Sequence, residues 1–141
     1  MRFMIIVKAT PDSEAGRFPP NPEPLFRAMA AYHEELARAG ALLDASGLQP
    51  SSKGWRVRYE GNGKRTIVDG PFAESKELVA GYTLIQTRTR QEAIEWSRRF
   101  PNPVGEGVAC HIEVRQLYEM EDFEGLLQAD TSERFRRIGV E

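Results

Sequence analysis

Apolar and polar residues alternate along several short stretches of this chain, as they do in strands with two distinct faces. Residues 2–8 (RFMIIVK) direct Phe3 and Ile5 to one face and Met4 and Ile6 to the other. Both faces are apolar, so we expect both to be covered. The same pattern predicts further strands at residues 41–48, 55–60, 64–69, 79–87 and 108–119.

Two segments instead repeat apolar residues every three or four positions, as amphipathic helices do. The first is predicted to begin near Pro24 and to stop at Gly40. The second is predicted to begin at Thr89, with Glu92 completing a capping box. The inward-facing residues would be Met29, Tyr32, Leu36 and Ala39 in the first helix, and Ala93, Ile94, Ser97 and Phe100 in the second.

The order of these elements predicts the fold. The predicted order is strand, helix, strand, followed by a second strand, helix, strand. A hairpin is inserted between these two halves, formed by residues 55–60 and 64–69 and joined by Gly-Asn-Gly. A split βαβ pair of this kind is α+β and ferredoxin-like, βαββαβ, with four strands and two helices on one face of the sheet. We expect the other face to pack on a second subunit in a symmetric dimer. The alternative is that the hairpin and the tail fold over it within one chain.

Composition is typical of a globular protein: of 141 residues, 40% are hydrophobic and 28% are charged. We predict one domain over residues 1–124 and a tail, residues 125–141, with a short helix beginning at Thr131 or Ser132. A net charge of −2 argues against direct nucleic-acid binding. The single cysteine, Cys110, favours a reducing compartment, most simply the cytoplasm. No apolar stretch is long enough to cross a membrane.

The segment Asp69-Gly70-Pro71-Phe72 is the strongest candidate for a functional turn. An Asp that opens a turn usually accepts a hydrogen bond from the N–H two residues later, but Pro71 has no N–H. Gly70 permits a positive φ, and we expect Phe72 to anchor the turn in the core. Asp69 would then be held rigidly, either as a general base or as part of a purely structural turn. Both interpretations stay open.

Three other polar residues are candidates beside this turn. Lys76 could offset the charge of a bound anion, and Glu74 could share a proton with Asp69; the alternative is a solvated polar turn with weak ion pairs. His33, next to Tyr32, can transfer a proton near neutral pH, or it is a residue at the helix boundary.

Cys110 and His111 are adjacent on a predicted strand and therefore point to opposite faces. We expect Cys110 to be a small core residue. With two histidines and one cysteine, the chain has no zinc-type spacing, so we expect neither a metal nor a cofactor. The predicted hairpin carries the basic residues Lys53, Arg56, Arg58, Lys64 and Arg65. They could bind an anionic ligand or a nucleic-acid backbone, or they form a solvated face that discourages edge pairing.

Several segments together resemble the YCII-related family, in its branch named for the Asp-Gly-Pro-Phe motif: MRFMIIVKAT, GLQPSSKG, VDGPFAESKELVAGY, EAIEWSRRFPNP and IEVRQLYEMEDF. The resemblance implies a dimeric α+β barrel. It also implies an enzyme, because a His–Asp pair in a cleft has been proposed for family members, or an accessory partner of extracytoplasmic-function sigma factors. Counted back from Gly40, the histidine of better-known relatives falls near Met29, whereas this chain has His33.

Two functional hypotheses follow. In the first, the protein binds a small anionic or aromatic molecule and acts as a lyase, isomerase or hydrolase. Asp69 and His33 would then be catalytic, and Phe72, Glu74 and Lys76 would contact the ligand, in a pocket between sheet and helices or at the dimer seam. In the second, it is a non-catalytic regulatory module linked to sigma-factor-dependent transcription. The sequence leaves open whether the protein is an enzyme.

Overall fold

The computed structural model of the chain describes residues 1–139. Its strands are β1 (Arg2–Lys8), β2 (Leu42–Gly47), β3 (Trp55–Tyr59), β4 (Arg65–Asp69), β5 (Val79–Gln86) and β6 (Ile112–Gln116). Its α-helices are α1 (Pro11–Glu14), α2 (Glu23–Arg38), α3 (Arg90–Arg98) and α4 (Ala129–Arg137). Three single-turn 3₁₀ helices are η1 (Ser51–Lys53), η2 (Ser75–Glu77) and η3 (Met120–Phe123).

The main sheet has four antiparallel strands in the order β2-β5-β1-β6, and β3 and β4 form a separate hairpin. This is the predicted ferredoxin-like βαββαβ arrangement, with the hairpin inserted between the second and third strands of the sheet. The register aligns Ile5 of β1 with Thr83 of β5 and Val114 of β6. Since residues opposite one another share a face, these three side chains lie on the same side of the sheet.

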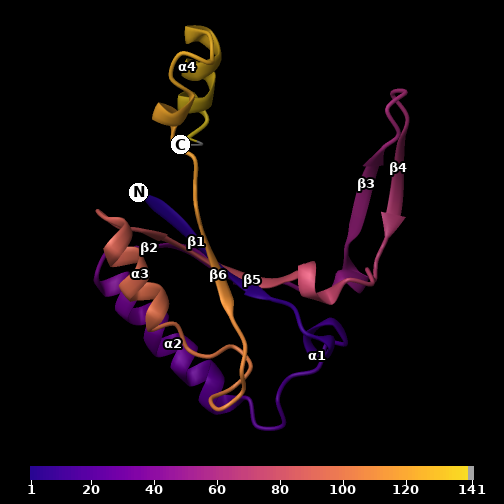
Figure 1. Cartoon of the computed structure of the whole chain (residues 1–141), viewed down its shortest axis with the longest axis vertical. Coiled ribbons are helices and arrows are strands. Elements are labelled where there is room, and N and C mark those ends of the chain that lie inside the picture. The colour runs from indigo at the N-terminus through magenta and orange to yellow at the C-terminus, as the bar shows by residue number, and fades with distance from the viewer. Residues whose placement is uncertain (140–141) are drawn as a thin grey trace.

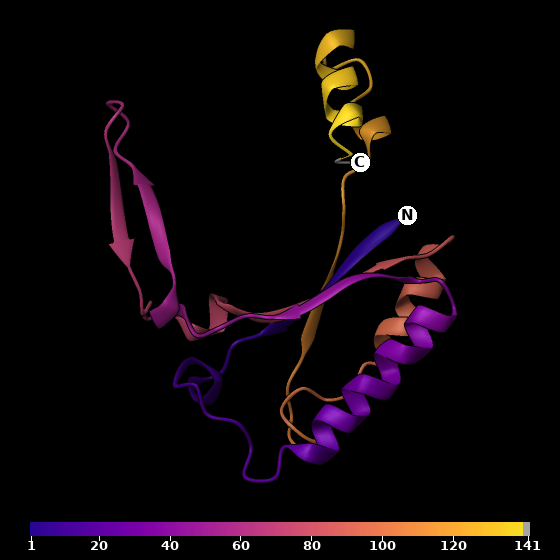
Figure 2. The same cartoon turned by 180° about the vertical axis from the view of Figure 1, so that it is seen from behind.

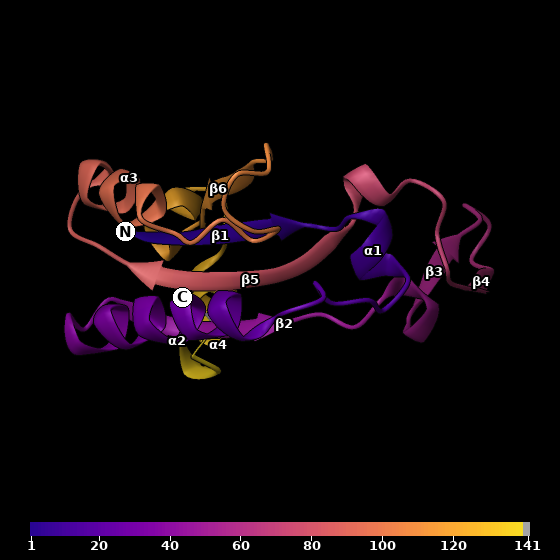
Figure 3. The same cartoon turned by 90° about the horizontal axis from the view of Figure 1, so that it is seen from below.

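That side is the one covered by helices. Helices α2 and α3 lie next to each other on one face of the sheet, and the other face carries no helix of its own (Figure 1, Figure 3). The core between them is small, and Ile5, Leu36 and Ile85 are completely buried in it. Its buried members are Phe3, Ile5, Tyr32, Leu36, Ala41, Ile85 and Ala93.

Tyr32 joins the two helices. Its hydroxyl donates a hydrogen bond of 2.7 Å to the backbone carbonyl of Trp96 on α3. Its ring lies edge-on to the rings of Trp96 and Phe100, with centroids 6.1 and 5.2 Å away. Edge-to-face contacts of this kind add to the stability that burial gives.

The helix starts agree with the predictions in part. Pro24 lies in the first turn of α2, and Thr89 caps α3 by accepting a hydrogen bond from the N–H of Glu92 at 3.1 Å. The Glu92 carboxylate accepts from the N–H of Arg88 (3.2 Å), so the expected reciprocal bond of a capping box is made one residue early. Helix α4 begins before the predicted position, and the one-turn helix α1 was not predicted.

The last strand was predicted too long. It was expected over residues 108–119, but β6 is shorter, because β1 ends at Lys8 and its pairing with β6 ends at Val7 opposite Ile112. The preceding residues form a loop organised by Asn102, which donates to the carbonyl of Val108 (2.8 Å). The Cys110 thiol donates to the Asn102 side-chain oxygen at 3.1 Å. Cys110 is exposed, so its expected place in the core is wrong.

Two segments project away from the sheet on the side opposite α2 and α3 (Figure 1, Figure 2). We call residues 53–69 the hairpin arm and residues 117–139 the C-terminal arm. They leave from opposite ends of β1. The hairpin arm is inserted between β2 and β5 near Lys8, which is aligned with Val79. The C-terminal arm begins where the Leu117 N–H donates to the carbonyl of Arg2 at 2.9 Å.

The face of the sheet between the arms is partly exposed. Met4 and Ile6 of β1 are aligned with Leu84 and Tyr82 of β5, and all four side chains are partly exposed on this open face. Within residues 1–139, none of the helices combines the length and the apolar character that a membrane span needs.

Candidate functional site

Asp69 ends strand β4 at the base of the hairpin arm, where it is aligned with Trp55 of β3. Its side chain is exposed. Among the groups that the structure describes, its carboxylate has neither a hydrogen-bond partner nor an ion pair, and the N–H of Phe72, three residues later, donates to Ser51. Asp69 is thus presented to solvent by a fixed backbone.

Ser51, in the 3₁₀ turn η1, binds the backbone N–H of Phe72. The Phe72 N–H donates to the Ser51 hydroxyl oxygen at 3.0 Å. The Ser51 hydroxyl in turn donates to one carboxylate oxygen of Glu14 (2.5 Å), and its backbone N–H donates to the other (3.0 Å). Glu14, Ser51 and Phe72 therefore tie helix α1, η1 and the Asp-Gly-Pro-Phe turn into one junction at the end of the sheet.

Gly70 is needed at this junction for a different reason than expected. Its φ is not positive, and the sequence-based expectation on this point is wrong. Instead, its N–H donates to the carbonyl of Gly54 (3.0 Å), and a Cβ at this position would lie 1.9 Å from the Ser51 carbonyl oxygen. Only glycine lets the two turns approach this closely.

The neighbouring candidate residues form no cluster with Asp69. Phe72 is half-buried and lies outside the main core, with the Arg56 guanidinium 3.8 Å above its ring centre. Such a cation–π contact holds the base of the hairpin arm against the turn. Glu74 and Lys76 are exposed on the turn that follows. Their roles in ligand binding stay predictions.

His33 is half-buried between α2 and the sheet. One ring nitrogen, Nδ1, lies 2.7 Å from the Met29 carbonyl, which can only accept, so Nδ1 carries the proton. In the neutral ring, Nε2 then accepts from the hydroxyl of Thr83 at 2.8 Å. Thr83 is buried, so this bond satisfies a polar group in the core. His33 contacts the main sheet through Thr83, whereas Asp69 ends β4 in the separate hairpin, and within the part of the chain that the structure describes no contact joins the two residues.

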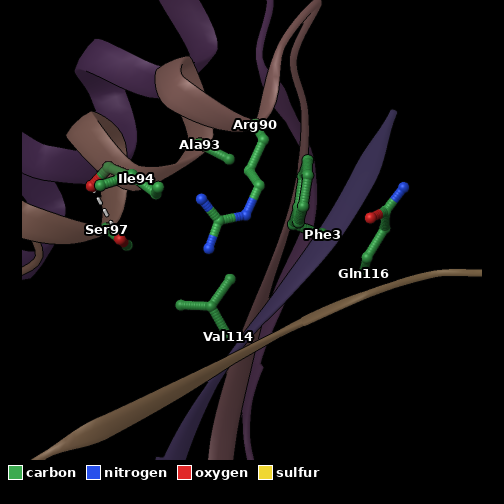
Figure 4. Close-up of a pocket in the computed structure, with 7 residues that line it drawn as sticks. All are labelled: Phe3, Arg90, Ala93, Ile94, Ser97, Val114 and Gln116. Carbon is green, nitrogen blue, oxygen red and sulfur yellow. Dashed lines mark hydrogen bonds between the residues drawn. The ribbon is translucent and has the colours of Figure 1, made fainter.

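A cleft lies instead between α3 and the sheet, with a volume of about 250 Å³. Its wall combines four apolar residues with three polar side chains from α3 and β6 (Figure 4). Its lining residues are Phe3, Arg90, Ala93, Ile94, Ser97, Val114 and Gln116. Figure 4 shows the Arg90 guanidinium extending from the start of α3 into the space between Ser97 and Val114.

The polar groups of this cleft are suited to an anion. Arg90 takes part in none of the ion pairs formed within residues 1–139. The Gln116 amide adds a second donor. The Ser97 hydroxyl donates to the Ile94 carbonyl at 2.8 Å and can still accept. In the part of the chain that the structure describes, no group of three or more His, Cys, Asp or Glu side chains could hold a metal ion.

Neither this cleft nor the junction around Ser51 is evident from the sequence. Nothing in the sequence distinguishes Arg90 from the other charged residues. Glu14 and Ser51 are 37 residues apart along the chain, so their contact could not be predicted from local sequence. The one available signal was the helical spacing of Ala93, Ile94 and Ser97, which was interpreted as core packing alone. Of these, Ala93 is buried, while Ile94 and Ser97 are half-buried at the edge of the cleft.

Comparisons with known proteins give the family. A family model described as the YCII-related domain matches residues 1–120. An uncharacterised protein of Rhizobium meliloti (strain 1021) is 31% identical over 80 residues, which are 57% of this chain and 64% of that relative. The chain therefore spans somewhat less than two thirds of the length of that relative.

Among solved structures, the fold is similar to 5-chloro-2-hydroxyhydroquinone dehydrochlorinase from Burkholderia phenoliruptrix AC1100, in complex with 2,5-dihydroxybenzoquinone. The TM-score is 0.44 and the identity 14%, over 84% of this chain and 94% of that chain. A likeness of this degree transfers no activity.

Proposed function

The chain belongs to the YCII-related family, and within that family we propose that it is a small-molecule-binding protein whose ligand is a small organic carboxylate held in the cleft between α3 and the sheet. The observation that carries the proposal is Arg90, an exposed cation whose guanidinium points into a cleft of mixed polar and apolar lining, with no acidic partner within residues 1–139.

The chemistry of the cleft selects the ligand class. A guanidinium binds a carboxylate through two parallel N–H···O bonds, which a neutral group does not reproduce. Phe3, Ile94 and Val114 would contact an apolar body attached to the carboxylate. A volume of about 250 Å³ suits a compact aromatic or aliphatic acid, because larger drug-sized ligands occupy pockets from about 300 Å³ upward.

The position of Arg90 supports the same conclusion. It is the first residue of α3, where the partial positive charge of the helix N-terminus disfavours a cation by about 0.3–1 kcal/mol. A bound carboxylate would offset both charges at once. Glu92, in the same first turn, already offsets part of this charge.

The cleft contains neither Asp69 nor His33. A chemical step at Asp69 stays a prediction. The alternative, a regulatory role linked to sigma factors, stays a prediction from the resemblance.

Binding is tested with benzoate as the probe and benzamide, its neutral analogue, as the comparison. We expect benzoate to shift the NMR resonances of the Arg90 side chain and of the backbone of α3, and benzamide to bind more weakly. Arg90→Gln should weaken benzoate binding about tenfold or more, because a charge-assisted hydrogen bond is lost. Arg98→Gln is the matched control, since Arg98 lies on the same helix, is 69% exposed and pairs with Glu95. Equal binding of benzoate and benzamide, or an unchanged affinity in Arg90→Gln, would refute the proposal.

We also propose that the protein is a homodimer, with the open face of the sheet at the dimer seam. Met4, Ile6, Tyr82 and Leu84 form an apolar band across the two central strands of that face. The two arms project away from the sheet and do not lie on this band (Figure 1, Figure 2). A second sheet packed face to face would cover it.

A further inference from the structure

The two arms of the protein have opposite charge. The hairpin arm, residues 53–69, carries five basic side chains and two acidic ones, Glu60 and Asp69. Residues 119–124, at the start of the C-terminal arm, carry four acidic side chains and no basic one. We call residues 119–124 the acidic segment. Glu119 pairs with Arg2 at 3.0 Å, and Glu121, Asp122 and Glu124 are exposed.

The hairpin arm also presents an apolar surface without cover in one chain. Val57 and Ile67 are aligned across the hairpin, and Trp55 and Tyr59 flank Val57 on the same face. Trp55 is 63% exposed, Tyr59 67% and Ile67 60%. Arg56 and Arg58 alternate with these residues and point to the other face of the hairpin, whereas the Arg65 guanidinium lies 4.8 Å from the centre of the Tyr59 ring. Exposed aromatic residues and arginines are both characteristic of protein interfaces.

The C-terminal arm offers a complementary surface. A groove of about 410 Å³ lies between η3 and α4, and its charged lining residues are Glu121, Glu124 and Arg136. Tyr118, 73% exposed, and Leu126, 76% exposed, flank the acidic segment. The arm thus combines acidic groups, exposed apolar side chains and a hollow.

The geometry of a symmetric dimer limits how these arms can meet. If two open faces pack on each other, the two-fold axis lies parallel to the sheets, and its two limiting directions are along the strands and across them. An axis along the strands brings hairpin arm to hairpin arm, with basic side chains facing basic ones. An axis across the strands brings each hairpin arm to the opposite end of the partner sheet, where the acidic segment lies. Like charges in contact at an interface disfavour the first arrangement.

We propose that in the homodimer the hairpin arm of each chain docks on the acidic segment of a second copy of the chain, so that two equivalent arm-to-arm contacts flank the seam between the sheets. This inference rests on the homodimer proposed above. Beyond the homodimer itself, the inference specifies which surfaces of the two chains pair and in which direction the two-fold axis runs.

The test is a charge exchange between the arms. Lys64→Glu/Arg65→Glu reverses the tip of the hairpin arm, and Glu121→Arg/Glu124→Arg reverses the acidic segment. Sedimentation velocity gives the dimer dissociation constant at low and high salt. We expect each reversal alone to weaken the dimer about tenfold or more, because it creates like-charge contacts. The four substitutions combined should restore most of the lost affinity, and salt should weaken the original dimer.

The control Arg27→Glu/Arg38→Glu lowers the net charge as much as the reversal of the hairpin arm does. Both arginines are on α2, on the side of the sheet away from the arms, and are 78% and 75% exposed. It should leave the dimer unchanged. Three results would overturn the inference: no restoration in the combined variant, a tighter dimer after reversing the hairpin arm alone, or a dimer insensitive to both reversals. A chain that stays monomeric would refute the homodimer itself, and the inference with it. Circular dichroism of each variant checks that the fold is intact.

Discussion

The hydroxyl of Tyr32 couples the stability of the helical layer to alkaline pH. Burial of the side chain raises the pKa of Tyr32 from 10.0 to about 12; the Arg99 guanidinium opposes this shift and the Glu35 carboxylate adds to it. The protonated hydroxyl also donates to the Trp96 carbonyl. The folded state therefore holds this proton more tightly than the unfolded state does.

The sign and size of the effect follow from linkage. Because the folded pKa is raised, the stabilisation is fully present below pH 10 and is lost as the pH rises through 10 towards 12. Each unit of pKa difference corresponds to about 1.4 kcal/mol, so this group alone lowers the free energy of unfolding by about 2 kcal/mol at pH 12.

The assay is urea unfolding at a series of pH values, for the original protein and for Tyr32→Phe. The variant should lose about 1 kcal/mol at neutral pH, because it leaves the Trp96 carbonyl without its donor. Its free energy of unfolding should then fall less steeply than that of the original protein between pH 10 and 12. Tyr118→Phe is the control, since Tyr118 is 73% exposed, and it should keep the original slope. Parallel curves for the original protein and Tyr32→Phe would refute the reasoning.

Two further predictions concern packing. Leu36 is completely buried, so Leu36→Ala should lower the free energy of unfolding by about 2–5 kcal/mol. The control Leu43→Ala changes a side chain that is 43% exposed and should lower it by less than about 1 kcal/mol. Equal losses would contradict the assigned core. Gly70→Ala should destabilise the protein by about 1–3 kcal/mol, because its Cβ would meet the Ser51 carbonyl oxygen at 1.9 Å. Gly47→Ala has no atom within 4 Å of its Cβ and should be close to neutral in the same denaturation experiment.

The α+β fold was predictable because its signals are local. Alternation in residues 2–8, helical spacing of Tyr32 and Leu36, and the Gly-Asn-Gly turn each depend on residues close in sequence. The prediction failed for Cys110, because the length of β6 depends on where β1 ends, and that partner is about a hundred residues away along the chain.

The candidate sites divide in the same way. The sequence correctly marked Asp-Gly-Pro-Phe as an unusual turn, but it gave no indication that Phe72 is held by Ser51, or that Ser51 is held by Glu14. It also singled out His33 without the means to identify Thr83 as its partner. These contacts join segments that only the folded chain brings together.

The sequence by itself determined the order of the elements, the apolar faces of strands and helices, and the charge of the hairpin, because each depends on residue type and periodicity. The tertiary structure decided which of these features meet. It separated His33 from Asp69, directed Arg90 into a cleft of its own, and set the basic hairpin arm and the acidic segment at opposite ends of one sheet face. The physical reason is that burial, close approach and charge complementarity are properties of pairs of segments, and strand register rather than local sequence decides which segments become neighbours.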